Sequence, residues 1–327
     1  MKRRAALGFV GLGLALAACA VPKGPPRDDV PGSRVALIGK AALDYPPTGQ
    51  LLQIGNTTVH AHVEGTGPDL ILIHGASGNT RDFTFSLVGK LKDRYRVIAF
   101  DRPGLGHTEP IAADGGSPAE QARLLDVAAE RLGVKSAIVL GQSYGGAVAM
   151  AWALERPERV AGLVIVSGAT MPWEGGLGPQ YALLSGKFGG AVIAPLASTI
   201  AIPPVERRAL NSVFAPQDPP EGYREYLGIP LSLRPHSVRA NARQIFELKG
   251  ALLDMAPDYP GIEVPAELIH GTADKIVPID VHSRRLVKVL PDANLTELPG
   301  IGHMPHHVAE GQVLAAIDRV AARAWPR

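Results

Sequence analysis

Short apolar runs recur along the chain from about residue 50, and most of them stop at a glycine or a polar residue. Leu51–Ile54 and Thr58–Val63 flank a Gly55–Asn56 turn, a pattern that predicts a hairpin. Most later runs lack polar–apolar alternation, which is typical of strands buried on both faces, as in a parallel sheet. These later predicted strands cover residues 69–73, 96–100, 137–140, 163–166, 266–269 and 295–298.

Helix signals lie between the strands. Ser117 is a suitable N-cap, Pro118 suits a first turn and Glu120 can reach back to the cap. This helix should run to Leu132 and end at Gly133. Other helical patterns cover residues 145–155 and 305–322, and Phe83, Leu87 and Leu91 recur at helical spacing. The alternation predicts an α/β fold, a mostly parallel, doubly wound sheet with helices on both faces.

The alternation stops between residues 171 and 260, where the chain is rich in glycine and proline. We expect a mainly helical cap there, inserted into a core made of residues 49–170 and 261–327. The apolar cap segment Ala191–Ile202 suits ordinary packing or contact with acyl chains. It is too short to span a bilayer.

The first 18 residues predict a signal peptide, with a basic start followed by the small, apolar stretch Ala5–Ala18. Leu16–Cys19 resembles the bacterial lipobox, which implies cleavage before a lipid-modified Cys19. A plain secretory signal and an uncleaved anchor are the alternatives. Residues 19–48 are rich in proline and predict a tether between lipid and domain.

The lipobox resemblance implies a protein of the bacterial cell envelope, held to a membrane through Cys19. Ala20 stands where an Asp would favour inner-membrane retention, so we expect the periplasmic face of the outer membrane. Cys19 is the only cysteine, which excludes an internal disulfide. Without its three basic leader residues, the chain's formal charge falls from +2 to −1. No basic stripe with aromatics occurs, so no nucleic-acid partner is expected, and no feature indicates an oligomeric state.

Gly141-Gln142-Ser143-Tyr144-Gly145 fits the pattern G-x-S-x-G between a predicted strand and a predicted helix. A sharp turn there lifts one hydroxyl above the sheet, and the flanking glycines let strand and helix pass closely. A serine in this pattern is often structural, but the strand and helix on either side favour Ser143 as a nucleophile.

A serine nucleophile needs a base, and the base needs an acid that fixes its tautomer. His303 follows the last predicted strand in a glycine-rich loop, and we predict it as the base over its neighbours His306 and His307. Asp274 follows the strand at 266–269 and precedes His303 by 29 residues. We predict it as the acid. A structural turn is the alternative role for Asp274, and Asp280 is the alternative acid.

Acyl transfer also requires donors directed at the developing oxyanion. The backbone N–H of Tyr144 lies at a helix start, where such groups lack intrahelical partners. Ala76, in the loop after the strand at 69–73, is the predicted second donor, and a plain tight turn is the alternative. The Asp101–Thr108 turn is expected to brace the active-site loops, and His107 is a candidate pocket residue.

In the order Ser143, Asp274, His303, these motifs resemble the α/β-hydrolase fold family over residues 50–325. The resemblance implies a serine hydrolase that cleaves a carboxylic ester or related acyl bond through an acyl-enzyme. It implies a small-molecule acyl substrate and neither a metal nor an organic cofactor. Dehalogenases and epoxide hydrolases of this fold place Asp at the nucleophile position, so Ser143 argues against both.

Three other activities fit the same triad: an aminopeptidase, a carbon–carbon bond hydrolase and a cofactor-free haloperoxidase-like enzyme. An aminopeptidase would need acidic cap residues for the substrate amine, and Glu174, Asp218 and Glu221 are available. The alternative of another class is a non-catalytic envelope lipoprotein that keeps the hydrolase scaffold. The intact serine, histidine and acid argue against it.

Overall fold

The computed structural model describes residues 40–111, 116–176 and 203–326. The signal peptide, Cys19, most of the tether and the apolar segment 191–202 lie outside these ranges. In the described part, no helix is both long and apolar enough to cross a membrane.

The core is one eight-stranded sheet in the order β1-β2-β4-β3-β5-β6-β7-β8. Pairing is antiparallel from β1 to β2 and from β2 to β4, and parallel in every other pair. All the strands predicted from the sequence are confirmed. They are β1 (Gln50–Ile54), β2 (Thr57–Glu64), β3 (Asp69–Ile73), β4 (Arg96–Phe100), β5 (Ala137–Gln142), β6 (Val160–Val166), β7 (Ala266–Gly271) and β8 (Ala293–Leu298).

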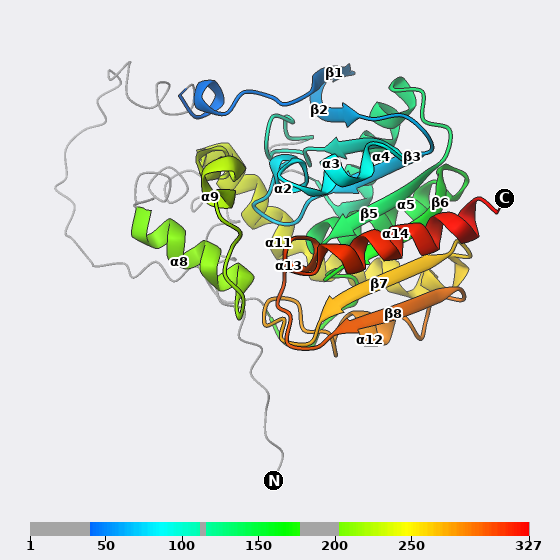
Figure 1. The fold of residues 1–327 in the computed structure, drawn as a ribbon. Coiled ribbons are helices and arrows are strands. Elements are labelled where there is room, and N and C mark those ends of the chain that lie inside the picture. Colours follow the sequence, from blue (N-terminus) through cyan, green and yellow to red (C-terminus); the bar gives the residue numbers. More distant parts are fainter. Residues whose placement is uncertain (1–39, 112–115, 177–202, 327) are drawn as a thin grey trace, which may run out of the picture.

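Both faces of the sheet are covered, which explains why the strands read as unbroken apolar runs. In β3, Ile71 and Ile73 belong to one core cluster, and Leu70 and Leu72 belong to the other. Helices α4 (Pro118–Arg131) and α5 (Tyr144–Glu155) supply the first face. Helices α3 (Leu87–Leu91) and α14 (Glu310–Ala324) supply the second, and Figure 1 shows α14 crossing in front of the strands.

Local signals located some helix ends well and others poorly. The predicted capping box begins α4, because Ser117 Oγ accepts from the Glu120 N–H and the Glu120 carboxylate accepts from the Ser117 N–H. The single helix predicted from Pro305 is wrong. Ala309 leaves helical geometry with φ −139°, so the short α13 (Pro305–Val308) precedes α14.

The helical spacing of Phe83, Leu87 and Leu91 also spans two helices instead of one. Phe83 lies in α2 (Arg81–Thr84) and the two leucines lie in α3, because Ser86 between them takes φ −146°. All three side chains are nevertheless buried. Short elements complete the core: η1 (Pro157–Arg159) before β6 and α12 (Ser283–Leu286) after β7.

The described part of the insertion between β6 and β7 is helical, as expected for a cap. Figure 1 shows α8 and α9 on the side of the molecule toward which the arrowhead of β7 points. The carboxyl ends of the parallel strands therefore face the insertion. Its elements are α8 (Pro203–Phe214), α9 (Tyr223–Leu227), α10 (Ile229–Ser232), α11 (Pro235–Met255) and η2 (Ala256–Gly261).

Candidate active site

Ser143 occupies a strained turn between the end of β5 and the start of α5. Its backbone has φ 53° and ψ −118°, a conformation that residues other than glycine rarely adopt. A Cβ on Gly141 would lie 2.2 Å from the Gly145 carbonyl oxygen, and one on Gly145 would lie 2.1 Å from that of Ile73. Both glycines of the sequence pattern are thus required by close backbone packing. The turn is held because the Ser143 N–H donates to Val166 O at 3.0 Å.

Asp274 and His303 follow neighbouring strands and form a buried hydrogen bond. His303 Nδ1 lies 2.7 Å from Asp274 Oδ2, while Asp274 Oδ1 accepts from the N–H groups of Ile276 and Val277 at 2.8 and 2.9 Å. Burial alone would raise the pKa of Asp274, but His303 and His270 outweigh it and hold that pKa below its ordinary value. An ionised Asp274 requires the proton on Nδ1, so Nε2 of His303 is the free base position.

His270 also contacts the acid, and the sequence analysis missed it. Its Nε2 lies 3.2 Å from Asp274 Oδ2 and 2.7 Å from Val277 O, and its Nδ1 lies 2.7 Å from Ser283 Oγ. The sequence did carry a signal for it: a polar residue near the end of an apolar strand, directly before the glycine that ends β7. We infer that His270 helps to hold the acid in place.

The residue before Ser143 contacts the ring of His303, although no hydrogen bond joins Ser143 to His303 themselves. Gln142, the residue before Ser143, has its Nε2 3.4 Å from His303 Nε2. Ser143 exposes 8% of its surface and His303 exposes 5%. Among the described residues the Ser143 hydroxyl has no hydrogen-bond partner. In unliganded enzymes such catalytic bonds are often long and tighten in the substrate complex.

The two predicted oxyanion donors flank the same serine. Tyr144 is the first residue of α5, and Ala76 lies in the loop after β3. Within the described ranges, neither backbone N–H has an acceptor. A Cβ on Gly75 would approach Ser143 Cβ to 3.0 Å, so the loop containing Ala76 packs directly beside the nucleophile.

The rival residues named from the sequence lie elsewhere. Asp280 is exposed and paired with Arg284 at 2.6 Å. His306 and His307 contact Asp82. The ring of His107 bonds Tyr45 O at 2.9 Å and packs on His60, and no contact joins it to the described catalytic residues.

A model of the α/β hydrolase fold family matches residues 68–310. The chain belongs to that family. It is 30% identical over 277 residues to the 2-hydroxy-6-oxononadienedioate/2-hydroxy-6-oxononatrienedioate hydrolase of Paraburkholderia phymatum, covering 76% of this chain and 86% of the relative. It is 28% identical over 287 residues to haloalkane dehalogenase 2 of Mycobacterium tuberculosis, covering 84% of this chain and 94% of the relative.

Solved structures share the same architecture. A thermophilic esterase from Thermogutta terrifontis superposes with a TM-score of 0.69 at 20% sequence identity, covering 84% of this chain and 99% of the esterase. At that identity the likeness shows the α/β hydrolase fold alone. The substrate class depends on this chain's own residues.

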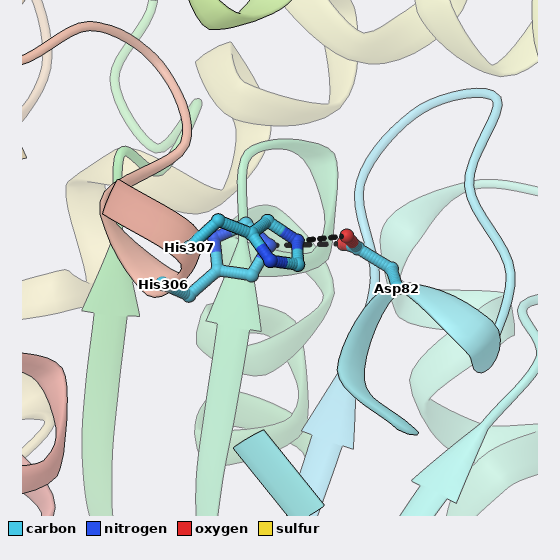
Figure 2. A group of neighbouring side chains, drawn as sticks. All are labelled: Asp82, His306 and His307. Carbon is cyan, nitrogen blue, oxygen red and sulfur yellow. Dashed lines mark hydrogen bonds and ion pairs between the residues drawn. The ribbon is translucent and has the colours of Figure 1, made fainter. Parts of the chain in front are cut away.

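A buried polar cluster in this α/β hydrolase joins α2 to α13 (Figure 2), and Tyr223 of α9 adds to it. Asp82 Oδ2 lies 3.1 Å from His306 Nε2, and Oδ1 lies 2.7 Å from His307 Nε2. The Tyr223 hydroxyl also donates to Oδ1, at 2.6 Å. These bonds hold both histidines of α13 against α2, and α13 is separated from α14 by the non-helical Ala309.

Two histidines and one carboxylate form a donor set that transition metals accept. Metal coordination through Nε2 would put the remaining proton of each ring on Nδ1, and such protons almost always need an acceptor. The Nδ1 atoms of His306 and His307 are buried without a partner among the described residues. The cluster therefore fits a hydrogen-bonded link between α2, α9 and α13 better than a metal centre.

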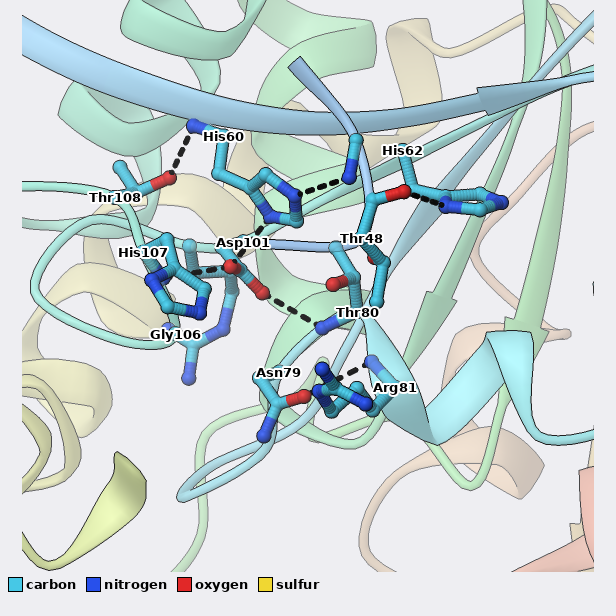
Figure 3. A network of polar contacts seen from close by, with 12 residues as sticks. Thr48, His60, His62, Asn79, Thr80, Arg81, Asp101, Gly106, His107 and Thr108 are labelled. Carbon is cyan, nitrogen blue, oxygen red and sulfur yellow. Dashed lines mark hydrogen bonds and ion pairs between the residues drawn. The ribbon is translucent and has the colours of Figure 1, made fainter. Parts of the chain in front are cut away.

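Another buried carboxylate, that of Asp101, braces the loops that follow β3 and β4 (Figure 3). Asp101 Oδ1 accepts from the Thr80 N–H at 2.6 Å, and Oδ2 accepts from His60 Nδ1 and the His107 N–H, both at 2.7 Å. The Gly49 N–H donates to His60 Nε2 at 3.0 Å, so Nδ1 is the ring nitrogen that donates to Asp101. Asp101 thus ties β2 to two loops, the bracing role expected for this turn.

Acid should weaken the fold through Asp101. Burial would raise the pKa of Asp101, but its hydrogen bonds, above all that from His60, lower the pKa to about 2 from the ordinary 3.8. A depressed carboxyl pKa stabilises the fold above about pH 4, and this stabilisation is lost as the pH falls toward 2. We expect Asp101→Asn to lower the free energy of unfolding by about 2 kcal/mol at pH 7 and by progressively less below pH 4.

Urea unfolding at pH 7, 4 and 3 measures this difference. Asp93→Asn, at an exposed position, is the matched control and should change nothing. A deficit for Asp101→Asn that stays constant across the three pH values would contradict the assignment of the charge to this carboxylate.

Proposed function

We propose that this protein is a serine hydrolase that cleaves a carboxylic ester or related acyl bond through an acyl-enzyme. One observation carries the proposal: the Asp274–His303 hydrogen bond lies at the carboxyl ends of the parallel strands, where Ser143 also occupies its strained turn. This arrangement supports a line from Ser143 as nucleophile to His303 as base and Asp274 as acid, which nucleophilic catalysis requires.

In the proposed mechanism, His303 Nε2 takes the proton of Ser143 Oγ as that oxygen attacks the substrate carbonyl carbon. The carbonyl oxygen becomes negative and accepts hydrogen bonds from the backbone N–H groups of Ala76 and Tyr144. His303 then gives its proton to the leaving alcohol as the carbon–oxygen bond breaks, which leaves the acyl group on Ser143. Water, deprotonated by the same Nε2, releases the acid and restores the serine.

Labelling with a fluorophosphonate tests the nucleophile directly. We expect one label per chain, mapped by peptide mass spectrometry to Ser143, because only an activated serine attacks this phosphorus. Prior denaturation of the protein is the control and should abolish labelling. A folded protein that takes no label would favour the alternative of a non-catalytic scaffold.

Carbon–carbon bond hydrolysis is the second candidate, and one comparison favours it. The relative from Paraburkholderia phymatum, at 30% identity, is named as a hydrolase of a 2-hydroxy-6-oxo dienedioate. Turnover of a p-nitrophenyl ester and of such a dienedioate by the same preparation separates the two. A kcat/KM at least tenfold higher for the dienedioate would replace the ester proposal.

The aminopeptidase alternative finds less support. Glu174, Asp218 and Glu221 are all exposed. An acidic group that holds a substrate amine is expected to face the buried serine instead. The dehalogenase relative does not change the proposal, since Ser143 occupies the position where dehalogenases of this fold carry Asp.

A further inference from the structure

Arg102 is a cation enclosed in the protein interior beside the proposed oxyanion site. The residue follows β4 and is fully buried. Within the described part of the chain, its guanidinium forms no ion pair with a carboxylate. Burying an unpaired charge is costly unless hydrogen bonds satisfy it. The hydrogen bonds that the guanidinium makes must therefore offset this cost.

The acceptors of these bonds include two consecutive carbonyl oxygens at the start of the loop after β3. Arg102 Nε donates to His74 O at 2.9 Å, and Nη2 donates to Gly75 O at 3.0 Å. Its Nη1 donates to the side-chain oxygens of Gln121 and Gln244 at 3.0 and 2.6 Å. The guanidinium fork is thus held by α4 on one side and by the cap helix α11 on the other.

The bond to Gly75 O determines where the next amide points. In a planar trans peptide the C=O and the following N–H point in opposite directions. His74 Nδ1 at 2.8 Å and the Gly78 N–H at 3.3 Å bond the same oxygen. With Gly75 O held by these donors and by Arg102, the Ala76 N–H is directed away from the guanidinium and remains free.

Arg102 also contacts the residue that carries the second donor. Its Cζ lies 4.2 Å from the centroid of the Tyr144 ring, in cation–π geometry. Gln121 also connects Arg102 to Tyr144, since its Oε1 accepts from Arg102 and its Nε2 lies 3.3 Å from the Tyr144 hydroxyl. One side chain therefore holds the carbonyl of the peptide that carries the Ala76 N–H and packs against the ring of Tyr144.

We propose that Arg102 is the positioning residue of the oxyanion hole, orienting the Ala76 and Tyr144 amides and placing a positive charge behind them. The inference rests on the proposed acyl-transfer function. Burial lowers the pKa of Arg102 to about 10, which still leaves the guanidinium charged at neutral pH. In the low-dielectric interior this charge favours the oxyanion more than the neutral ester.

The test compares Arg102→Met and Arg102→Lys with the wild-type protein on one p-nitrophenyl ester. Loss of an oxyanion donor costs about 10² to 10³ in kcat, and we expect about 10² for the Met variant with KM changed less than threefold. The Lys variant keeps the charge but cannot bridge two carbonyls, so it should lose about tenfold. Affinity for a trifluoromethyl ketone, which forms a tetrahedral oxyanion on the serine, should fall in parallel with kcat.

Arg159→Met is the matched control. Arg159 pairs with Glu130 and lies at the amino end of β6, away from the loops at the carboxyl ends, so its loss should affect stability only. If Arg102→Met does not fold, Gln244→Met removes one guanidinium acceptor and should still lower kcat several-fold. Folded Arg102 variants with unchanged kcat and inhibitor affinity would overturn the inference. Ser143→Ala, assayed alongside, reports separately on the proposed function: a fully active Ser143→Ala protein would refute that function itself.

Discussion

Replacing Ser143 with alanine is expected to lower kcat for ester hydrolysis by on the order of 10⁵-fold or more. The variant keeps the fold, because the turn depends on backbone packing at Gly141 and Gly145 and not on the hydroxyl. It loses the only atom that can carry the acyl group in the proposed mechanism. The activity that remains would come from substrate binding and the backbone donors alone.

The measurement is the steady-state rate on a p-nitrophenyl ester, together with fluorophosphonate labelling of the same samples. The variant's melting temperature should stay within a few degrees of wild type, which confirms that the loss is chemical. Retention of even a tenth of the wild-type rate would show that another group is the nucleophile.

The second largest effect is expected for Asp274→Asn, a loss of about 10⁴-fold in kcat. The N–H groups of Ile276 and Val277 require an oxygen at the Oδ1 position, so the new amide nitrogen must take the place of Oδ2. That nitrogen donates to His303 Nδ1 and forces the ring proton onto Nε2. The base then faces Ser143 with a proton in place of a lone pair.

Asp280→Asn is the matched control, because Asp280 is the other carboxylate of the same loop and pairs only with Arg284 among the described residues. It should leave kcat within about twofold of wild type. Equal losses in the two variants would mean that the loop, and not the tautomer, governs the rate. A small loss for Asp274→Asn alone would return the acid role to another residue.

His270 makes the Asp274 result more informative. Its Nε2 lies 3.2 Å from the same oxygen that binds His303, so the acid is held from two sides in the interior. The arrangement helps to explain how a carboxylate that is almost fully buried keeps its charge. In the Asn variant, this second histidine would face an N–H group, which strengthens the expected loss.

The sequence predicted the parts of the fold whose signals are local. The apolar runs of β3 through β7 identified strands covered on both faces, and Ser117 with Glu120 identified the start of α4. Ser143 was recognisable because its glycines, strand and helix are neighbours in the chain. Asp274 and His303 were recognisable because each follows a strand in a loop, and parallel strands end at a common edge.

Local signals failed where distant side chains compete with them. The pattern after Pro305 is helical, yet bonds from His306 and His307 to Asp82, more than 220 residues earlier, accompany the break at Ala309. The spacing of apolar residues along a helix cannot reveal a hydrogen bond to a residue so far away in the chain. The break at Ser86 between α2 and α3 is likewise not visible in the apolar spacing.

By itself, the sequence determined the alternation of strands and helices, the strained serine turn and the identity of the three proposed catalytic residues. Only the tertiary structure decided that the buried Arg102 binds the Gly75 carbonyl and packs on the Tyr144 ring, and that His270 shares the carboxylate of Asp274. The physical reason is that backbone conformation follows from neighbours in the chain. The partners of a buried charge, in contrast, come from whichever strands, loops and helices the fold places around it.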